Sequence, residues 1–405
     1  MKRRALLATT AVALGGCSSL TGSDSEASDD DPNGNEDDNG NGSSEPIDEE
    51  PGTFDDFEDL SKWTVMAGSL DADTDRTYTG SQSARVTADE SDERAMIKRE
   101  FDSPRDLSNE WPALAMAADR DVNAVVQLTD ADSNRYLLRS SVKGDLPLAP
   151  HDLGVHDTVG EPDLSEIVHL KISFWAGEDR SLTLWCDDLQ FVSRPDTGKV
   201  MIQFDDGFET TTAAHSILAE YDVPATAFVN TGRVGDDGRL DTDQLRALAD
   251  DGWTVASQGA TGSNLTQWDG DGQAEDFEAA KAWLDDNGFG DGAAYFAYPL
   301  GRFDETTLDL AADHHELAFA GGYPVHGEIA NPHRVPRAVH PSADEARALL
   351  DRTATMRGIT TITYRELDGD GLDALESTMS HLAELVSAGE LEVVLPADIA
   401  ANHLH

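Results

Sequence analysis

The chain changes its hydrophobic pattern near residue 195. Before this point, short segments alternate apolar and polar residues, and Gly, Asp and Asn separate them, which is typical of antiparallel strands. The clearest of these segments are residues 124–128, 168–174 and 182–185. Repeated short strands with turn residues between them predict a β-sandwich over residues 53–196.

After residue 196, apolar runs alternate with segments of helical periodicity. We expect strands at residues 200–204, 225–229, 253–256, 294–298, 317–320, 360–363 and 391–395. We expect helices at residues 211–221, 242–250, 274–286, 304–312, 343–353 and 372–387. Repeated βα units require a parallel sheet covered by helices, so we predict an α/β fold, open or closed into a barrel, over residues 197–405. The chemistry of such folds lies at the carboxyl ends of the strands.

The first 17 residues have the layout of a secretory signal peptide. Lys2, Arg3 and Arg4 precede a short apolar stretch, and residues 14–17 read Leu-Gly-Gly-Cys. The paired arginines resemble a twin-arginine export signal, and the segment that ends at Cys17 resembles a lipobox, in which the cysteine becomes the lipidated first residue. We expect an exported protein held by a lipid on Cys17 at the outer face of the cell membrane. The alternative is that Cys17 is an incidental residue of a cleaved leader.

Acidic residues dominate the composition. Residues 18–52 are rich in Ser, Asp, Glu, Gly and Asn, and we predict a disordered linker there because such a segment cannot bury enough apolar surface to fold. The whole chain carries 79 Asp and Glu against 29 Lys and Arg, a formal net charge of −50. This charge repels phosphate backbones, so nucleic acid is not an expected partner. Because the acidic excess continues into well-patterned segments, we predict a folded halophilic protein, since salt screens its self-repulsion.

Two adjacent carboxylates follow the first expected strand of the second domain. Asp205 and Asp206 come directly after residues 200–204 and precede Gly207, which allows a sharp turn. Adjacent carboxylates that leave a strand point in different directions, so one can bind a metal while the other takes a proton from water. The same three residues also form ordinary turns, and the surrounding segments must distinguish the two interpretations.

Those segments resemble the polysaccharide deacetylase family. The similarity extends from residue 199 to about residue 399, and residues 204–207, 221–229 and 295–301 occur in the order found in that family. The resemblance implies a distorted (β/α) barrel that hydrolyses acetyl groups from N-acetylated or O-acetylated sugars, with an acetylated polysaccharide or surface glycan as its partner. In enzyme terms, it implies a hydrolase acting on carbon–nitrogen bonds other than peptide bonds.

The resemblance also implies roles for single residues. It makes Asp205 the general base and Asp206 a ligand of a divalent metal, usually zinc. Arg337 takes the position of the arginine that supports the base, and the backbone N–H of Leu300 takes the oxyanion-stabilising position. The two residues before Leu300 are expected to bind substrate; they are Tyr298 and Pro299.

The resemblance is incomplete at the metal site. The two histidine positions hold Gln258 and Gly262, and residues 361–366 contain no histidine where the family places its general acid. Asp206 with Gln258 and solvent is a poor zinc site, because zinc favours imidazole, thiolate and well-placed carboxylate ligands. The sequence therefore predicts either an altered zinc site or a site that binds no metal. Three histidines lie in loops that could reach the barrel mouth; they are His326, His333 and His340. We expect each of them to be an exposed loop side chain rather than a replacement ligand.

The first domain resembles jelly-roll carbohydrate-binding modules at residues 57–63, 78–86 and 185–191. Its tryptophans could stack on sugar rings, but we expect most of them in the core; they are Trp63, Trp111, Trp175 and Trp185. We expect Cys186 to be a small buried side chain.

Three functional interpretations follow. The first is a surface-anchored deacetylase with an altered or absent metal. The second is a non-catalytic glycan-binding protein, to which the first domain adds avidity. The third is a structural part of the cell envelope without sugar affinity.

Overall fold

The structure is a computed structural model that describes residues 52–405. The predicted signal peptide, Cys17 and the predicted linker up to residue 51 lie outside the described residues, and those predictions stay predictions. No helix in the described part of the chain has the length and apolar character needed to cross a membrane.

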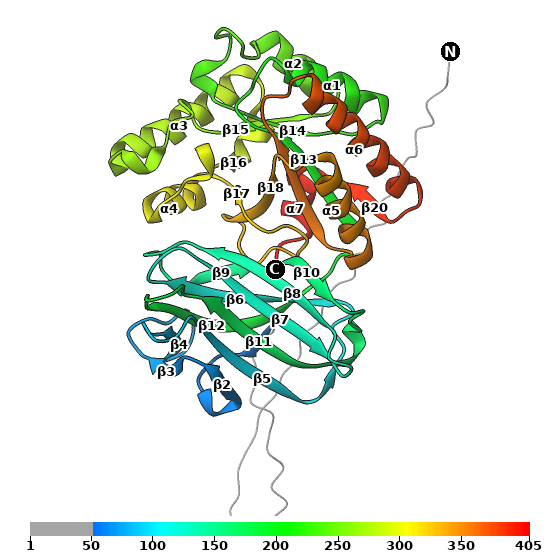
Figure 1. The fold of residues 1–405 in the computed structure, drawn as a ribbon. Helices are drawn as coiled ribbons and strands as arrows, with labels where there is room; N and C mark the ends of the chain where they lie inside the picture. Colours follow the sequence, from blue (N-terminus) through cyan, green and yellow to red (C-terminus); the bar gives the residue numbers. More distant parts are fainter. Residues whose placement is uncertain (1–51) are drawn as a thin grey trace, which may run out of the picture. The chain divides into compact units, whose positions relative to one another are not determined.

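Two antiparallel sheets of six strands each form the N-terminal domain (Figure 1). The first sheet contains β1 (Thr53–Asp55), β3 (Ser69–Asp73), β4 (Ser83–Ala88), β6 (Glu110–Ala118), β9 (Ala149–Asp152) and β12 (Leu182–Ser193). The second contains β2 (Trp63–Ala67), β5 (Arg94–Arg105), β7 (Val122–Asp130), β8 (Arg135–Val142), β10 (Gly154–Val159) and β11 (Ile167–Trp175). Buried side chains of both sheets, such as Met116 and Ile172, belong to one hydrophobic cluster. The expected strands are confirmed, whereas the jelly-roll connectivity stays a prediction.

Most tryptophans of this domain lie in its core, as expected. Trp63, Trp111 and Trp185 are buried, whereas Trp175 at the end of β11 is 57% exposed. Cys186 is a free, fully buried cysteine, and burial raises the pKa of its thiol. A buried thiol of this kind is unreactive.

The C-terminal domain is built on eight parallel strands. They are β13 (Gly198–Phe204), β14 (Thr226–Val229), β15 (Thr254–Ser257), β16 (Tyr295–Ala297), β17 (Leu317–Gly321), β18 (Val335–Val339), β19 (Ile359–Tyr364) and β20 (Leu391–Val393). The order β14-β15-β16-β17-β18-β19-β13 closes through a pairing of β13 with β14. β20 pairs with the start of β13 at Gly198–Val200, and β14 pairs with its end at Gln203 and Phe204. The predicted α/β barrel is therefore confirmed.

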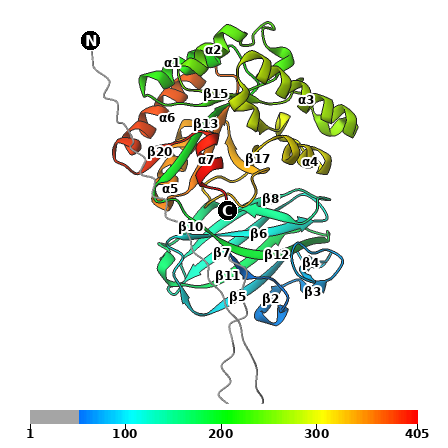
Figure 2. The same cartoon turned by 180° about the vertical axis from the view of Figure 1, so that it is seen from behind.

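Helices follow the strands and surround the barrel (Figure 2). They are α1 (Thr211–Glu220), α2 (Thr242–Asp250), α3 (Gly270–Asn287), α4 (Glu305–His314), α5 (Ala343–Met356), α6 (Gly369–Ser387) and α7 (Pro396–Asn402). Local sequence explains where several begin. The side chain of Asp241 accepts a hydrogen bond from the backbone N–H of Gln244 at the start of α2, and Ser342 and Glu345 make the same arrangement at α5. Such capping satisfies N–H groups that have no acceptor within the helix.

The described residues form one compact unit. The long loop after β17 contacts the N-terminal domain, because the backbone N–H of Val155 donates to the carbonyl of Val325 at 3.1 Å. The N–H of Ala330 also donates to the Asp152 carboxylate at 2.9 Å. Val325 belongs to the hydrophobic cluster of the two sheets. The two domains thus share buried apolar and polar contacts.

Candidate active site

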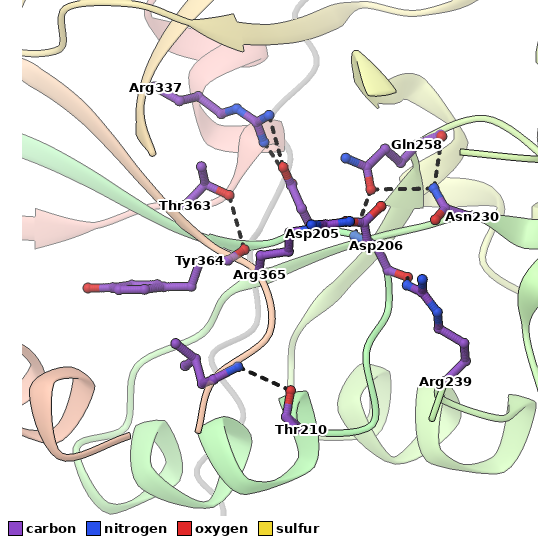
Figure 3. A network of polar contacts seen from close by, with 11 residues as sticks. Asp205, Asp206, Thr210, Asn230, Arg239, Gln258, Arg337, Thr363, Tyr364 and Arg365 are labelled. Atoms are coloured by element: carbon purple, nitrogen blue, oxygen red, sulfur yellow. Dashed lines mark hydrogen bonds and ion pairs between the residues drawn. The ribbon is translucent and has the colours of Figure 1, made fainter. Parts of the chain in front are cut away.

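The end of β13 carries both adjacent carboxylates. Asp206 and Gly207 both have left-handed backbone conformations, with φ of 68° and 64°. Aspartate tolerates this conformation better than most residues, and glycine adopts it freely. The resulting sharp turn directs the side chains of Asp205 and Asp206 to different partners (Figure 3).

Asp205 forms a two-point ion pair with Arg337. The two guanidinium nitrogens of Arg337 donate to the two carboxylate oxygens at 2.8 and 3.1 Å. Both side chains are largely buried, at 3% exposure for Arg337 and 13% for Asp205. Arg337 also donates to Oε1 of Gln203 at 3.2 Å. The geometry fixes the orientation of the carboxylate, and each oxygen keeps a second lone pair that can accept a proton.

These three residues come from strands that are not neighbours. Gln203 lies on β13 and Arg337 lies on β18, and β19 lies between those strands in the barrel. The side chain of Arg337 therefore reaches Asp205 past β19 at the strand ends. The structure brings together the two residues that the resemblance paired, and their catalytic roles stay a prediction.

Asp206 pairs with a different arginine. Its carboxylate forms an ion pair with Nε of Arg365, which follows β19 and is 46% exposed. Its backbone N–H donates to Oε1 of Gln258 at 2.6 Å, and its carbonyl accepts a hydrogen bond from Arg239. Figure 3 shows Arg239 and Gln258 on opposite sides of Asp206. Asp206 is thus held through its side chain and both backbone polar groups.

The second expected ligand position is closed by Asn230. Gly262 has φ of +67°, and a Cβ atom on it would lie 2.5 Å from Cγ of Asn230. The Asn230 side chain in turn donates to the carbonyl of Gln258 at 3.2 Å. A side chain of imidazole size at position 262 therefore requires both a strained backbone and displacement of Asn230.

These residues do not fit a zinc ion. Asp206 is engaged by Arg365, Oε1 of Gln258 already accepts an N–H, and Gly262 offers no donor atom. Within residues 52–405, no group of three or more His, Cys, Asp and Glu side chains has a metal-binding arrangement. Protein zinc sites use three or four such ligands.

Leu300 lies in a short 3₁₀ turn, Pro299–Gly301, directly after β16. Its φ is 57° and its side chain is 60% exposed. The N–H of the second residue in such a turn has no acceptor within the turn, so it is available to another group. This is the property that an oxyanion donor needs.

The predicted substrate contacts of Tyr298 and Pro299 are corrected by the structure. Tyr298 is fully buried, and its hydroxyl donates to the carbonyl of His333 at 2.9 Å. Burial raises the pKa of this hydroxyl. Pro299 is buried as well. Their side chains pack the interior and support Leu300 rather than facing a ligand.

The loop histidines differ from one another. His326 is buried, which contradicts the expectation of an exposed loop residue, and its Nδ1 pairs with the carbonyl of Gly327 at 2.8 Å. His333 pairs through Nε2 with the carbonyl of His315 at 3.0 Å. His340 is exposed and directly follows β18.

His340 lies close enough to the two aspartates and their arginine partners for these charges to affect its pKa. The pKa of His340 is lowered overall, because partial burial of its ring and the positive charges of Arg365 and Arg337 outweigh the negative charges of Asp205 and Asp206.

The sequence did not predict four residues of this cluster; they are Gln203, Asn230, Arg239 and Arg365. Arg365 directly follows β19, and Asn230 directly follows β14. Both positions immediately follow barrel strands, whose carboxyl ends meet around the mouth. The position of a polar residue just after each expected strand was therefore the available signal.

Comparisons with known proteins found similarities in the C-terminal half of the chain. The polysaccharide deacetylase family model matches residues 193–316. The chain is 24% identical over 222 residues to YxkH of Bacillus subtilis (strain 168), whose name describes a polysaccharide deacetylase; the match covers 49% of this chain and 78% of that protein.

Solved structures of similar proteins include a family 4 carbohydrate esterase from Streptomyces lividans in complex with acetate. It is 18% identical, with a TM-score of 0.39, over 49% of this chain and 94% of that one. A family 4 acetyl xylan esterase from Clostridium thermocellum, solved with a cobalt ion, is 15% identical with a TM-score of 0.36, over 50% of this chain and 90% of that one.

Proposed function

We propose, from the polysaccharide deacetylase domain in the C-terminal half of the chain, that the protein hydrolyses acetyl groups from glycans without a bound divalent metal. The observation that carries the proposal is the pair of adjacent ion pairs at the barrel mouth. Arg337 holds Asp205, and Arg365 occupies the carboxylate of Asp206 that would otherwise bind the metal. The guanidinium of Arg365 thus supplies a positive charge beside the candidate base, where a metal ion would otherwise supply it.

The proposed reaction uses Asp205 as a proton carrier. Asp205 takes a proton from a water molecule, whose oxygen attacks the acetyl carbonyl carbon and forms a tetrahedral intermediate. The backbone N–H of Leu300 stabilises the oxyanion, since a fixed donor is most effective where charge develops. The bond from carbon to the sugar nitrogen or oxygen then breaks, and the leaving atom receives the proton from Asp205. The products are acetate and a free amine or hydroxyl.

The replacement of a metal ion by Arg365 at Asp206 limits how strongly the site can activate water. A guanidinium supplies positive charge and hydrogen bonds, but it does not lower the pKa of a bound water as a metal ion does. Water activation then depends on Asp205 alone. Because an ester carbonyl is more reactive than an amide carbonyl, we expect O-acetyl groups to be released faster than N-acetyl groups.

Export and anchoring belong to the same proposal and rest on the sequence of residues 1–17. A lipid on Cys17 would place the enzyme at the outer face of the membrane, where surface glycans lie. The variant Cys17→Ser should release the protein from the membrane fraction. Retention of this variant in the membrane fraction would contradict lipid anchoring.

Acetate release from a panel of O-acetylated and N-acetylated oligosaccharides tests the hydrolase proposal. We expect release by the wild-type protein and loss of at least about 99% of it in Asp205→Asn, because general base catalysis contributes about 10²–10⁴-fold. The matched control is Asp243→Asn, which changes a highly exposed carboxylate on α2. Equal activity of Asp205→Asn and Asp243→Asn would contradict the role of Asp205.

The second candidate function is glycan binding without hydrolysis. Two observations favour it: position 262 offers no ligand, and β19 is followed by Arg365 rather than a histidine. This candidate predicts that a folded wild-type protein retains glycans and releases no acetate. It also predicts that Asp205→Asn retains glycans equally well.

A further inference from the structure

A large cavity of about 880 Å³ lies between the loops of the barrel and the two-sheet domain. Five basic side chains line it; they are Arg120, Lys143, Arg180, Arg302 and Arg334. Only two acidic residues, Asp121 and Asp152, line it. The formal charge of the residues that line the cavity is therefore +3, in a chain whose net charge is −50. This concentration of positive charge is opposite in sign to the rest of the molecule.

Most of these cations have no carboxylate partner. Asp121 pairs with Lys143 at 2.7 Å, so the two charges offset each other. In residues 52–405, no carboxylate oxygen lies within 4.0 Å of the guanidinium groups of Arg180, Arg302 or Arg334. Unpaired guanidinium groups present hydrogen-bond donors that match carboxylate and sulfate oxygens.

Arg334 is held in place by a neutral histidine. Its Nη1 lies 3.2 Å from Nε2 of His151, and Nδ1 of His151 lies 3.0 Å from Oγ of Ser140. A guanidinium cannot accept a hydrogen bond, so Nε2 of His151 accepts and Nδ1–H donates to Ser140. Burial, together with the charge of Arg334, holds the pKa of His151 well below its ordinary value. The histidine thus orients Arg334 without neutralising it.

The partial burial of Arg334 makes an anionic ligand favourable. Loss of solvent lowers the pKa of Arg334 to about 10, because the charged form is disfavoured there. A charge removed from water needs a partner. The guanidinium lies 5.3 Å from the centroid of the Phe303 ring, and Asp152 acts on it only from beyond 4.0 Å, so an anionic group in the cavity would supply a direct charged partner.

The shape of the cavity suits a sugar chain. The exposed ring of Trp175 lines it, and such rings stack on the apolar faces of sugars. Gly321 at the end of β17 also lines it, and a Cβ atom there would have no neighbour within 4 Å. Leu300 is a further lining residue, so the cavity extends to the turn that carries the candidate oxyanion donor.

We propose that this cavity binds a glycan segment that carries carboxylate or sulfate groups. Arg180, Arg302 and Arg334 would bind the anionic groups, and Trp175 would stack on a sugar ring. Salt screens the long-range repulsion from the acidic surface, since the Debye length is about 3 Å at 1 M salt, whereas a contact to the largely buried Arg334 is screened much less than contacts to the exposed Arg180 and Arg302. The proposal concerns binding and does not depend on hydrolysis, so it goes beyond the proposed function.

Calorimetric titration of the protein at constant KCl tests the proposal. The probes are tetragalacturonate, a sulfated tetrasaccharide, neutral chitotetraose and the oligonucleotide dT8. We expect at least one acidic oligosaccharide to bind about tenfold or more tightly than chitotetraose and dT8, since charge-assisted hydrogen bonds to several arginines add up. The first two probes distinguish a carboxylated from a sulfated ligand. Equal affinity for chitotetraose, or tighter binding of dT8, would overturn the proposal.

A double variant and its control localise the binding. Arg180 and Arg302 are exposed, and their side chains make no hydrogen bond within the described part of the chain, so Arg180→Gln/Arg302→Gln should leave the fold intact. We expect this variant to bind the acidic probe at least about tenfold more weakly. Arg347→Gln, on the exposed face of α5, should bind it as the wild type does. Unchanged binding by the double variant, with an unchanged circular dichroism spectrum, would exclude this cavity.

Discussion

At the scale of single residues, the Asp205–Arg337 pair combines a structural and a chemical role. Both oxygens of the carboxylate are occupied by a largely buried guanidinium. Such a pair fixes the orientation of the carboxylate more than it raises the free energy of unfolding, because the loss of solvation offsets much of the attraction between the charges. Removal of one partner is different, since it leaves the other charge buried and unpaired.

Arg337→Gln should therefore lower the free energy of unfolding by about 3–5 kcal/mol. The double variant Asp205→Asn/Arg337→Gln should recover most of that loss, because no charge stays unpaired. Chemical denaturation of the wild type, both single variants and the double variant measures this coupling. If the double variant loses as much as the two single variants summed, the pair is not the source of the effect.

His315 gives a pH dependence with a defined sign. Burial lowers the pKa of His315 to about 3, its Nδ1 pairs with the carbonyl of Ala293 at 2.9 Å, and its buried Nε2 has no partner within residues 52–405. The folded state therefore excludes a proton that the unfolded state binds below about pH 6.5. The contribution of His315 is full above that pH and decreases as the pH falls towards 3.

The expected slope is about 1.4 kcal/mol per pH unit between pH 6 and pH 5 for this one group. His315→Gln should remove that share of the slope at constant KCl. Urea denaturation at pH 7, 6 and 5 measures it. Identical slopes for the variant and the wild type would show that His315 takes up its proton without unfolding.

At the scale of elements, the turn after β15 excludes a metal ligand through its backbone. Gly262 and Gly238 both have left-handed conformations, with φ of +67° and +75°. A Cβ atom would contact Asn230 at position 262, whereas nothing lies within 4 Å at position 238. Substitution of each glycine therefore distinguishes the free energy lost through backbone strain from the free energy lost through steric overlap with Asn230.

Gly238→Ala should lower the free energy of unfolding by about 1–2 kcal/mol from backbone strain alone. Gly262→Ala should lower it by at least about 1 kcal/mol more, since overpacking adds to the strain. Thermal or urea unfolding of both variants compares them. Equal losses would show that Asn230 moves aside freely and that position 262 can accept a side chain.

The elements themselves were largely predictable from the sequence. Apolar runs flanked by helical periods located most barrel strands, and the expected helix at residues 242–250 coincides with α2 (Thr242–Asp250). β18 was not predicted as a strand because Val335–Val339 contains Pro336 and Arg337, which interrupt the apolar run of a buried strand. The short helix α7 (Pro396–Asn402) was missed because seven residues carry little periodicity.

The candidate site was predictable only in part. Asp205, Asp206, Arg337 and Leu300 followed from the family resemblance. The Asp206–Arg365 pair depends on which strand ends meet at the mouth, and the closure of position 262 by Asn230 depends on a backbone conformation. Local patterns place Arg365 and Asn230 just after strands, but they encode neither the pairing with Asp206 nor the backbone conformation at position 262.

At the scale of the whole molecule, the net charge of −50 predicts a dependence on salt. The free energy of unfolding should rise with KCl between 0.2 and 3 M at pH 7, because self-repulsion destabilises the compact state and salt screens it. The rise should shrink near pH 4, where many carboxylates take up protons. Denaturation curves at both pH values measure it, and a flat response at pH 7 would contradict a fold adapted to high salt.

The central claim of the proposal is that Arg365 takes the place of a metal ion at the proposed deacetylase site. The most direct measurement is acetate release from an O-acetylated oligosaccharide by the wild type and Arg365→Gln, after chelator treatment and after added zinc, with the bound metal counted by mass spectrometry. The account predicts that the wild type binds no stoichiometric zinc, is equally active in both conditions, and loses activity in Arg365→Gln. Stoichiometric zinc in the wild type, with activity that the chelator removes and zinc restores, would contradict it.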